Sequence, residues 1–160
     1  MTQSNAATTF SKPSDLEIGM TRVFDAPREL VFQAYTDPEH IPHWWGQRNS
    51  TTIVDTMDVR PGGLWRYIQR DPDGNEYAFN GEYREVVAPE RLVYTFEFEG
   101  MPGHIVVNTM TFEERDGKTT ITSTSLFASV EDRDGMLESG MESGANESWD
   151  RLAELLETLR

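Results

Sequence analysis

The feature that most constrains the fold is an amphipathic pattern at the end of the chain. Acidic residues there alternate with apolar or small residues, which recur in steps of three and four and so share one face of a helix. A helix of this length needs an apolar surface to pack against. We therefore expect the preceding residues to form that surface. The face consists of Met141, Ala145, Trp149, Leu152, Leu156 and Leu159.

The segment from residue 15 to 127 carries the pattern of half-buried strands. Apolar and polar residues alternate with period two in seven short runs that turn residues separate. Two helix patterns, each with a proline at its start, lie between the first and second runs, at about 27–35 and 38–45. The predicted strands are 16–24, 53–57, 64–69, 77–84, 92–99, 104–114 and 119–127.

We predict an α+β fold in which about seven antiparallel strands curve around one long C-terminal helix, with two short helices after the first strand. Residues 15–160 form this single domain. Residues 1–14, rich in Thr, Ser, Asn and Gln, are expected to be a flexible tail. The last helix is predicted to begin near Ser129. Glycines in its first turns favour a kink or a movable entrance, namely Gly135, Gly140 and Gly144.

Charge and composition exclude several classes of partner. The formal net charge of −14 opposes nucleic acid and anionic membranes, whose binding begins with basic contacts. The absence of cysteine excludes disulfides, thiolate metal sites and cysteine nucleophiles. No apolar stretch is long enough to cross a membrane, and no signal-peptide pattern opens the chain. We therefore expect a cytoplasmic protein that binds neither nucleic acid nor a membrane.

The predicted inner face of the sheet combines bulky rings with a few small polar side chains. Asn108, Ser123 and Ser125 face inward on the last two strands, where they leave volume and require hydrogen-bond partners. An apolar cavity with a few polar groups is typical of a small-molecule site, although these serines could instead face the helix and bond locally. The predicted ligand-lining residues are Trp45, Met57, Tyr67, Phe79, Tyr94, Phe96, Asn108, Met110, Ser123, Ser125, Met136 and Met141.

The residues that could carry chemistry do not form a recognisable catalytic motif. His40 and His43 have a spacing that could share a metal ion, but too few further ligands are in prospect, so we predict no metal and no cofactor. Of the carboxylates on predicted inward positions, Asp55 and Glu85 lie near strand ends, and we assign no catalytic residue. Trp45, beside Trp44, is expected to plug the core; alternatively the pair forms one wall of a ligand entrance.

Several runs of residues resemble the family of the Hsp90 ATPase activator homologue, in the START-like (SRPBCC) superfamily. The resemblance covers about residues 15–160 and implies the helix-grip fold, in which a curved sheet surrounds a C-terminal helix. The runs are Arg22–Pro27, Thr36–Pro38, Trp44–Gly46, Met57–Tyr67, Asp71–Gly74, Phe79–Tyr83, Pro89–Val93, Gly140–Gly144 and Asp150–Leu152.

The resemblance implies a range of functions rather than one, since such folds host carriers, cyclases, hydrolases and co-chaperone modules. We expect a binding protein for a small hydrophobic or aromatic molecule. The alternatives are an enzyme of cyclase or dehydratase type acting on such a ligand, and an interaction module that modulates an Hsp90-like chaperone. The eukaryotic co-chaperone carries a further N-terminal domain for which 160 residues leave no room. A homodimer is one option for assembly.

Overall fold

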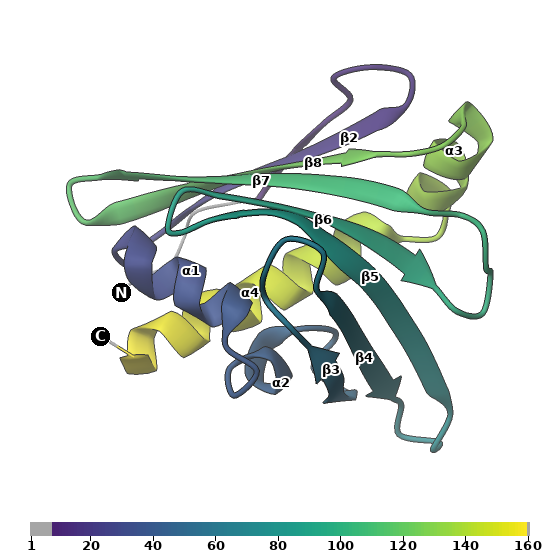
Figure 1. Cartoon of the computed structure of the whole chain (residues 1–160), viewed down its shortest axis with the longest axis horizontal. Coiled ribbons are helices and arrows are strands. Elements are labelled where there is room, and N and C mark those ends of the chain that lie inside the picture. The colour runs from purple at the N-terminus through teal and green to yellow at the C-terminus, as the bar shows by residue number, and fades with distance from the viewer. Residues whose placement is uncertain (1–7, 160) are drawn as a thin grey trace.

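The computed structural model describes residues 8–159, which form a curved antiparallel sheet around a C-terminal helix (Figure 1). Eight strands of the described chain follow the spatial order β1-β2-β8-β7-β6-β5-β4-β3, and each neighbouring pair is antiparallel. The strands are β1 (Thr9–Ser11), β2 (Glu17–Phe24), β3 (Thr51–Met57), β4 (Leu64–Arg70), β5 (Glu76–Val87), β6 (Arg91–Phe98), β7 (Val106–Arg115) and β8 (Lys118–Leu126).

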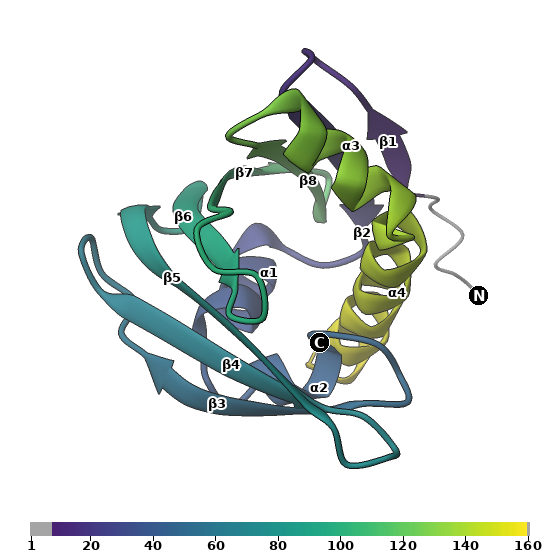
Figure 2. The ribbon, with the colours of Figure 1, turned by 90° about the vertical axis from the view of Figure 1, so that its right-hand side faces the viewer.

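The helices occupy the concave side and the open edge of this sheet. The two short helices α1 (Arg28–Thr36) and α2 (Ile41–Trp44) connect β2 to β3, as predicted, while α3 (Val130–Glu138) and α4 (Met141–Leu159) follow β8. In Figure 2 the sheet curls around an interior, and α4 runs beside β2 and α2 across the open side. The arrangement is a helix gripped by a sheet, which confirms the predicted fold class.

The predicted apolar face of the last helix is the face that enters the core. Trp149, Leu152 and Leu156 are buried, and the Trp149 ring meets Phe24 of β2 edge to face at 5.4 Å. The expected single helix from residue 129 is wrong in one respect. Gly140 adopts a φ of +84°, a left-handed conformation that favours glycine, and it separates α3 from α4. The kink expected in this region is therefore a complete break.

Polar contacts fasten α4 to the elements on both sides of it. Arg22 of β2 is buried, and its Nη1 donates a hydrogen bond of 2.6 Å to Asp150. On the opposite side Arg151 donates to the backbone carbonyls of Gly46 at 2.9 Å and His43 at 3.2 Å, at the end of α2. These contacts fix the position of α4 across the open side of the sheet.

Two glycines show how local sequence shapes the sheet. The hairpin between β7 and β8 turns at Asp116-Gly117, both with positive φ, as the Asp-Gly pair predicts. Gly81 lies within β5, where an added Cβ would stand 1.8 Å from the Thr95 carbonyl oxygen. Gly81 therefore allows the backbones of β5 and β6 to pack closely, and any larger residue there would push the two strands apart.

The first strand corrects the expectation for residues 1–14. Residues 9–11 form β1, which pairs with residues 19–21 of β2, so the sheet has eight strands rather than about seven. The expectation for residues 1–7 lies outside the described residues. Within residues 8–159, no helix combines the length and the apolar character that crossing a membrane requires.

Candidate functional site

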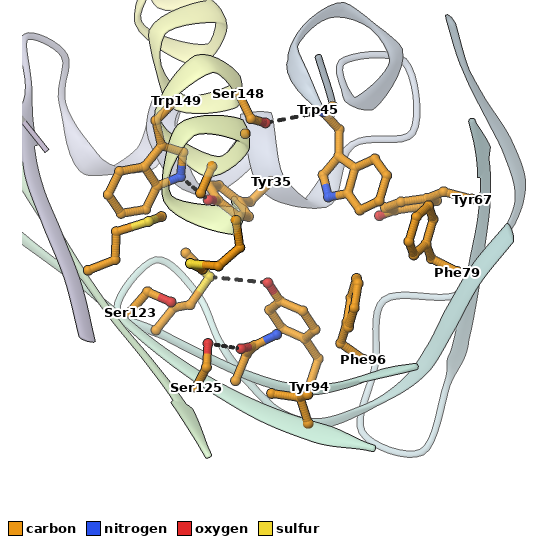
Figure 3. Close-up of a pocket in the computed structure, with 18 of the residues that line it drawn as sticks. Tyr35, Trp45, Tyr67, Phe79, Tyr94, Phe96, Ser123, Ser125, Ser148 and Trp149 are labelled. Atoms are coloured by element: carbon orange, nitrogen blue, oxygen red, sulfur yellow. Dashed lines mark hydrogen bonds between the residues drawn. The ribbon is translucent and has the colours of Figure 1, made fainter. Parts of the chain in front are cut away.

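A cavity of about 420 Å³ lies between the concave face of the sheet and helices α1, α2 and α4 (Figure 3). It exists because α4 spans the curled sheet without filling it, while small side chains stand where rings would be needed to occupy the space. Its wall draws on every strand from β4 to β8, on β2, and on all four helices. The principal side chains are Tyr35, Trp45, Tyr67, Phe79, Tyr94, Phe96, Asn108, Met110, Ser123, Ser125, Met136, Met141, Ser148 and Trp149.

The structure brings the predicted ligand-lining residues together around this one cavity, except for Met57. The Met57 side chain packs against the core behind the wall, where its sulfur accepts a hydrogen bond of 3.7 Å from the Tyr67 hydroxyl. A bulge in β3 between Val54 and Thr56 explains the position of this segment. The extra residue reverses the inward and outward alternation, so Thr52 and Val54 turn inward before it and Met57 after it.

The tryptophan pair is placed the opposite way round from the expectation. Trp44, not Trp45, is the core plug: it is buried, and its Nε1 donates a hydrogen bond of 2.9 Å to the Ala34 carbonyl. Trp45 already has an extended backbone and is only partly buried. Both rings line the cavity, in agreement with the alternative that the pair forms a wall. The cause is the end of α2, where the chain leaves the helix between the two rings.

Residues on the helices complete the wall, and the sequence reasoning did not assign them to a site. Tyr35 of α1 and Trp149 of α4 lie next to each other in the wall, with Trp149 Nε1 donating to the Tyr35 hydroxyl at 2.7 Å (Figure 3). Ser148 accepts from the Gly46 amide at 3.2 Å and donates to the Trp44 carbonyl at 3.1 Å. Helical periodicity marks Tyr35 and Trp149 as buried, but it does not separate a core position from a cavity position.

One end of the cavity is built from aromatic rings. Trp45 meets Tyr67 and Phe79 edge to face at 5.1 and 5.3 Å, and Phe79 stacks on Phe96 at 5.5 Å. In Figure 3 these four rings gather on one side of the open space. Such a wall presents both ring faces and ring edges, which suits a flat apolar group.

The other end carries the polar side chains of β6, β7 and β8. Ser125 donates a hydrogen bond of 2.6 Å to the Asn108 side-chain oxygen, and the Tyr94 hydroxyl lies 3.6 Å from the Met110 sulfur. Ser123 lies on the same wall, and its hydroxyl has no hydrogen-bond partner among residues 8–159. The expectation that the serines face inward is met, and the local-bonding alternative holds only for Ser125.

The tyrosine hydroxyls in the wall are held in their protonated form. Burial raises the pKa of Tyr35, Tyr67 and Tyr94 well above the usual value of 10, and neighbouring tyrosines add to the effect. Burial also raises the pKa of Tyr83 to about 12, against a smaller opposing effect of its hydrogen bond with Tyr67. All four groups are therefore neutral hydroxyls at physiological pH, able to donate a hydrogen bond.

The cavity wall, within the described chain, contains no Asp, Glu, His, Lys or Arg. The two carboxylates considered as inward candidates lie outside it: Asp55 pairs with Arg66 at 3.4 Å, and Glu85 pairs with Arg91 at 3.0 Å. Both pairs are partly exposed to solvent. In residues 8–159 no three His, Asp or Glu side chains come together in a way that could hold a metal ion.

The segment around Gly140, where α3 ends and α4 begins, contributes two flexible methionine side chains to the cavity wall. Met136 of α3 and Met141 of α4 line the cavity on either side of Gly140. The loop between β6 and β7 contacts α3, since His104 Nδ1 lies 2.9 Å from the carboxylate of Asp132 in that helix. Unbranched methionine side chains adapt to a guest without backbone movement.

Comparisons with known proteins agree with the fold and the resemblance. The chain is similar to protein Ms6760 from Mycobacterium smegmatis, with 29% identity, coverage of 93% of this chain and 96% of that chain, and a TM-score of 0.84. A protein from Staphylococcus epidermidis shares 31% identity over 95% of each chain, with a TM-score of 0.80. A protein from Arthrobacter aurescens shares 25% identity over 94% of this chain and 91% of that one, with a TM-score of 0.87.

A comparison with curated proteins finds no match. The family model described as Activator of Hsp90 ATPase homolog 1-like protein matches residues 25–157, which hold most of the sheet, the cavity wall and α4. The chain therefore belongs to the Activator of Hsp90 ATPase homolog 1-like protein family.

Proposed function

We propose that the protein binds a small, largely hydrophobic molecule in the cavity between the sheet and α4. The observation that carries this proposal is the wall itself: rings at one end, a few polar groups at the other, and no formal charge among the described residues that line it. A volume of about 420 Å³ falls within the range of small-molecule sites. A space of this size that served only folding would cost stability, because unfilled apolar volume is destabilising.

The polar residues give the ligand a preferred orientation in this proposal. Tyr94, Asn108, Ser123 and Ser125 stand at one end of the cavity, so a polar group on the ligand would lie there and its apolar body among the rings. Tyr67 lies in the ring wall, with its hydroxyl 3.7 Å from the Met57 sulfur, and would contact the apolar body of the ligand.

The enzyme alternative receives less support from the same wall. A cyclase or dehydratase moves protons, and general acid–base catalysis works best with a group whose pKa lies near the operating pH. The titratable groups of the described wall are tyrosines, and burial raises the pKa of each further from neutrality. A binding protein needs no such group.

The test is a titration with Nile red, a neutral dye that fluoresces in apolar surroundings. We expect saturable binding with one site per chain. Ser123→Leu places a larger apolar side chain in the cavity, and we expect at least tenfold weaker binding with an unchanged circular dichroism spectrum. Thr124→Leu is the matched control, because the next residue on β8 points to the opposite face of the sheet.

Two results would contradict the proposal. Wild-type protein that shows no saturable binding would remove the binding function. Equal affinity in Ser123→Leu and Thr124→Leu would mean that the dye binds elsewhere on the molecule. A second filling variant, Ser125→Leu, keeps the test decisive if Ser123→Leu unfolds, although this variant also removes the hydrogen bond to Asn108.

A further inference from the structure

The hydrogen-bonding groups that the cavity leaves unused are mainly donors. The Trp45 indole N–H has no acceptor among residues 8–159, and Figure 3 shows its nitrogen on the side of the ring that faces the cavity. The Tyr94 hydroxyl donates to the Met110 sulfur, at 3.6 Å. The Tyr67 hydroxyl lies 3.7 Å from the Met57 sulfur and also shares a hydrogen bond with the Tyr83 hydroxyl, so it is not an unused donor. Thioether sulfur is a weak acceptor, so an oxygen acceptor would be the better partner.

The strongest acceptor on the polar wall is already occupied. The Asn108 side-chain oxygen accepts from Ser125 at 2.6 Å, and the Tyr35 hydroxyl accepts from Trp149 at 2.7 Å. A ligand that brings only donors would compete with these short bonds. A ligand that brings an acceptor would meet the Tyr94 hydroxyl, whose present acceptor is a sulfur atom.

The lack of charged side chains in the described cavity wall is the second constraint on the ligand. A carboxylate transferred into the cavity would lose its hydration and find no cation in the described wall. The arginines on the flanking elements are already engaged, Arg22 with Asp150 and Arg151 with the backbone carbonyls at the end of α2. The net charge of −14 also disfavours the approach of an anion.

We propose that the cavity selects an uncharged ligand that presents a carbonyl or similar acceptor oxygen to Tyr94, and that it discriminates against the corresponding carboxylate. The inference rests on the proposed binding function and adds the chemical class of the ligand. The acceptor lies at the β6–β8 end, and the apolar body lies against Trp45, Phe79 and Phe96.

Three fluorescent probes with one ring system separate the two parts of this inference. Methyl 1-pyrenebutyrate has the carbonyl and no charge, 1-pyrenebutyrate has the carboxylate, and 1-butylpyrene has neither. With the full chain at pH 7.5, we expect the ester to bind at least tenfold more tightly than the acid. Tyr94→Phe should weaken the ester about fivefold and leave 1-butylpyrene unchanged. Tyr77→Phe, on the exposed part of β5 outside the cavity, should change neither.

The outcomes distinguish the inference from the function on which it rests. If no probe binds saturably to the wild-type chain, the proposed function is wrong. If the acid binds as tightly as the ester, binding stands and the selection for uncharged ligands is wrong. If Tyr94→Phe weakens the ester and 1-butylpyrene equally, the hydroxyl acts through cavity shape, and the assignment of an acceptor oxygen is wrong.

Discussion

The ion pair between β2 and α4 gives the sharpest test of how the last helix is held. Its two sides differ greatly in exposure: the Arg22 side chain is 2% exposed and the Asp150 side chain is 43% exposed. The guanidinium lies over the Phe24 ring at 5.3 Å, and its buried Nε has no partner in the described structure. Removal of Asp150 would therefore leave a buried cation without its counter-ion. Removal of Arg22 would leave a carboxylate that water can reach.

This asymmetry sets the expected magnitudes. Breaking a buried pair from one side costs about 3–5 kcal/mol, and we place Asp150→Ala at the lower end, about 3 kcal/mol, because water can approach the gap that it leaves. Glu154→Ala, one turn further along α4, is the matched control. It breaks a pair with Arg48 in which both side chains are at least half exposed, and such pairs contribute about 1 kcal/mol or less.

Urea denaturation followed by circular dichroism measures both variants, and for a chain of this length about 3 kcal/mol lowers the melting temperature by about 6–12 °C. Arg22→Met introduced into Asp150→Ala should restore most of the loss, because an apolar side chain then fills the space without a charge. Equal costs for Asp150→Ala and Glu154→Ala, or no recovery in the double variant, would refute the reasoning.

Two further predictions concern the buried rings. Trp149→Ala should cost about 3–5 kcal/mol, since the ring is 2% exposed and loses both Phe24 and Tyr35 as partners; a urea midpoint near that of the wild type would mean that α4 does not use this face. The pKa of about 12 for Tyr83, against 10 in an unfolded chain, stabilises the fold below pH 10, and this stability is lost as the pH rises toward 12, by about 2–3 kcal/mol. Urea midpoints at pH 9, 10 and 11 should fall less steeply in Tyr83→Phe, and parallel slopes in the two proteins would contradict the assignment.

The parts of the fold that follow from local periodicity could be predicted from the sequence. The buried face of α4 and the hairpin at residues 116–117 are such parts. The strand at residues 9–11 could not, because three residues carry no periodicity and their pairing with β2 is a long-range contact. The helix break illustrates the same limit. Three glycines stand between residues 135 and 144, and only Gly140 takes a positive φ.

The site shows a similar division. Alternation on β7 and β8 predicts correctly that Asn108, Ser123 and Ser125 line the interior. On β3 the predicted inner face was wrong: Thr52 and Val54 face inward, so Asp55 faces outward to Arg66, and a bulge after Val54 then turns Met57 inward. A bulge depends on how neighbouring strands pair, and no single residue between 51 and 57 predicts it.

The separation of charge from the cavity is what links the fold to the proposed function. The chain carries twice as many acidic as basic residues, 28 against 14, yet the described cavity wall includes none of either kind. A buried charge without a partner is among the most costly features that a fold can contain, so an uncharged wall is expected of any stable core. What distinguishes this interior is that the Tyr94 hydroxyl donates to a sulfur atom, while the Ser123 hydroxyl and the Trp45 indole N–H have no hydrogen-bond partner among residues 8–159. In a core that served stability alone, we would expect such groups to be fully hydrogen-bonded within the protein, or apolar side chains to stand in their place. Their retention next to open volume therefore favours a guest that completes the hydrogen bonds.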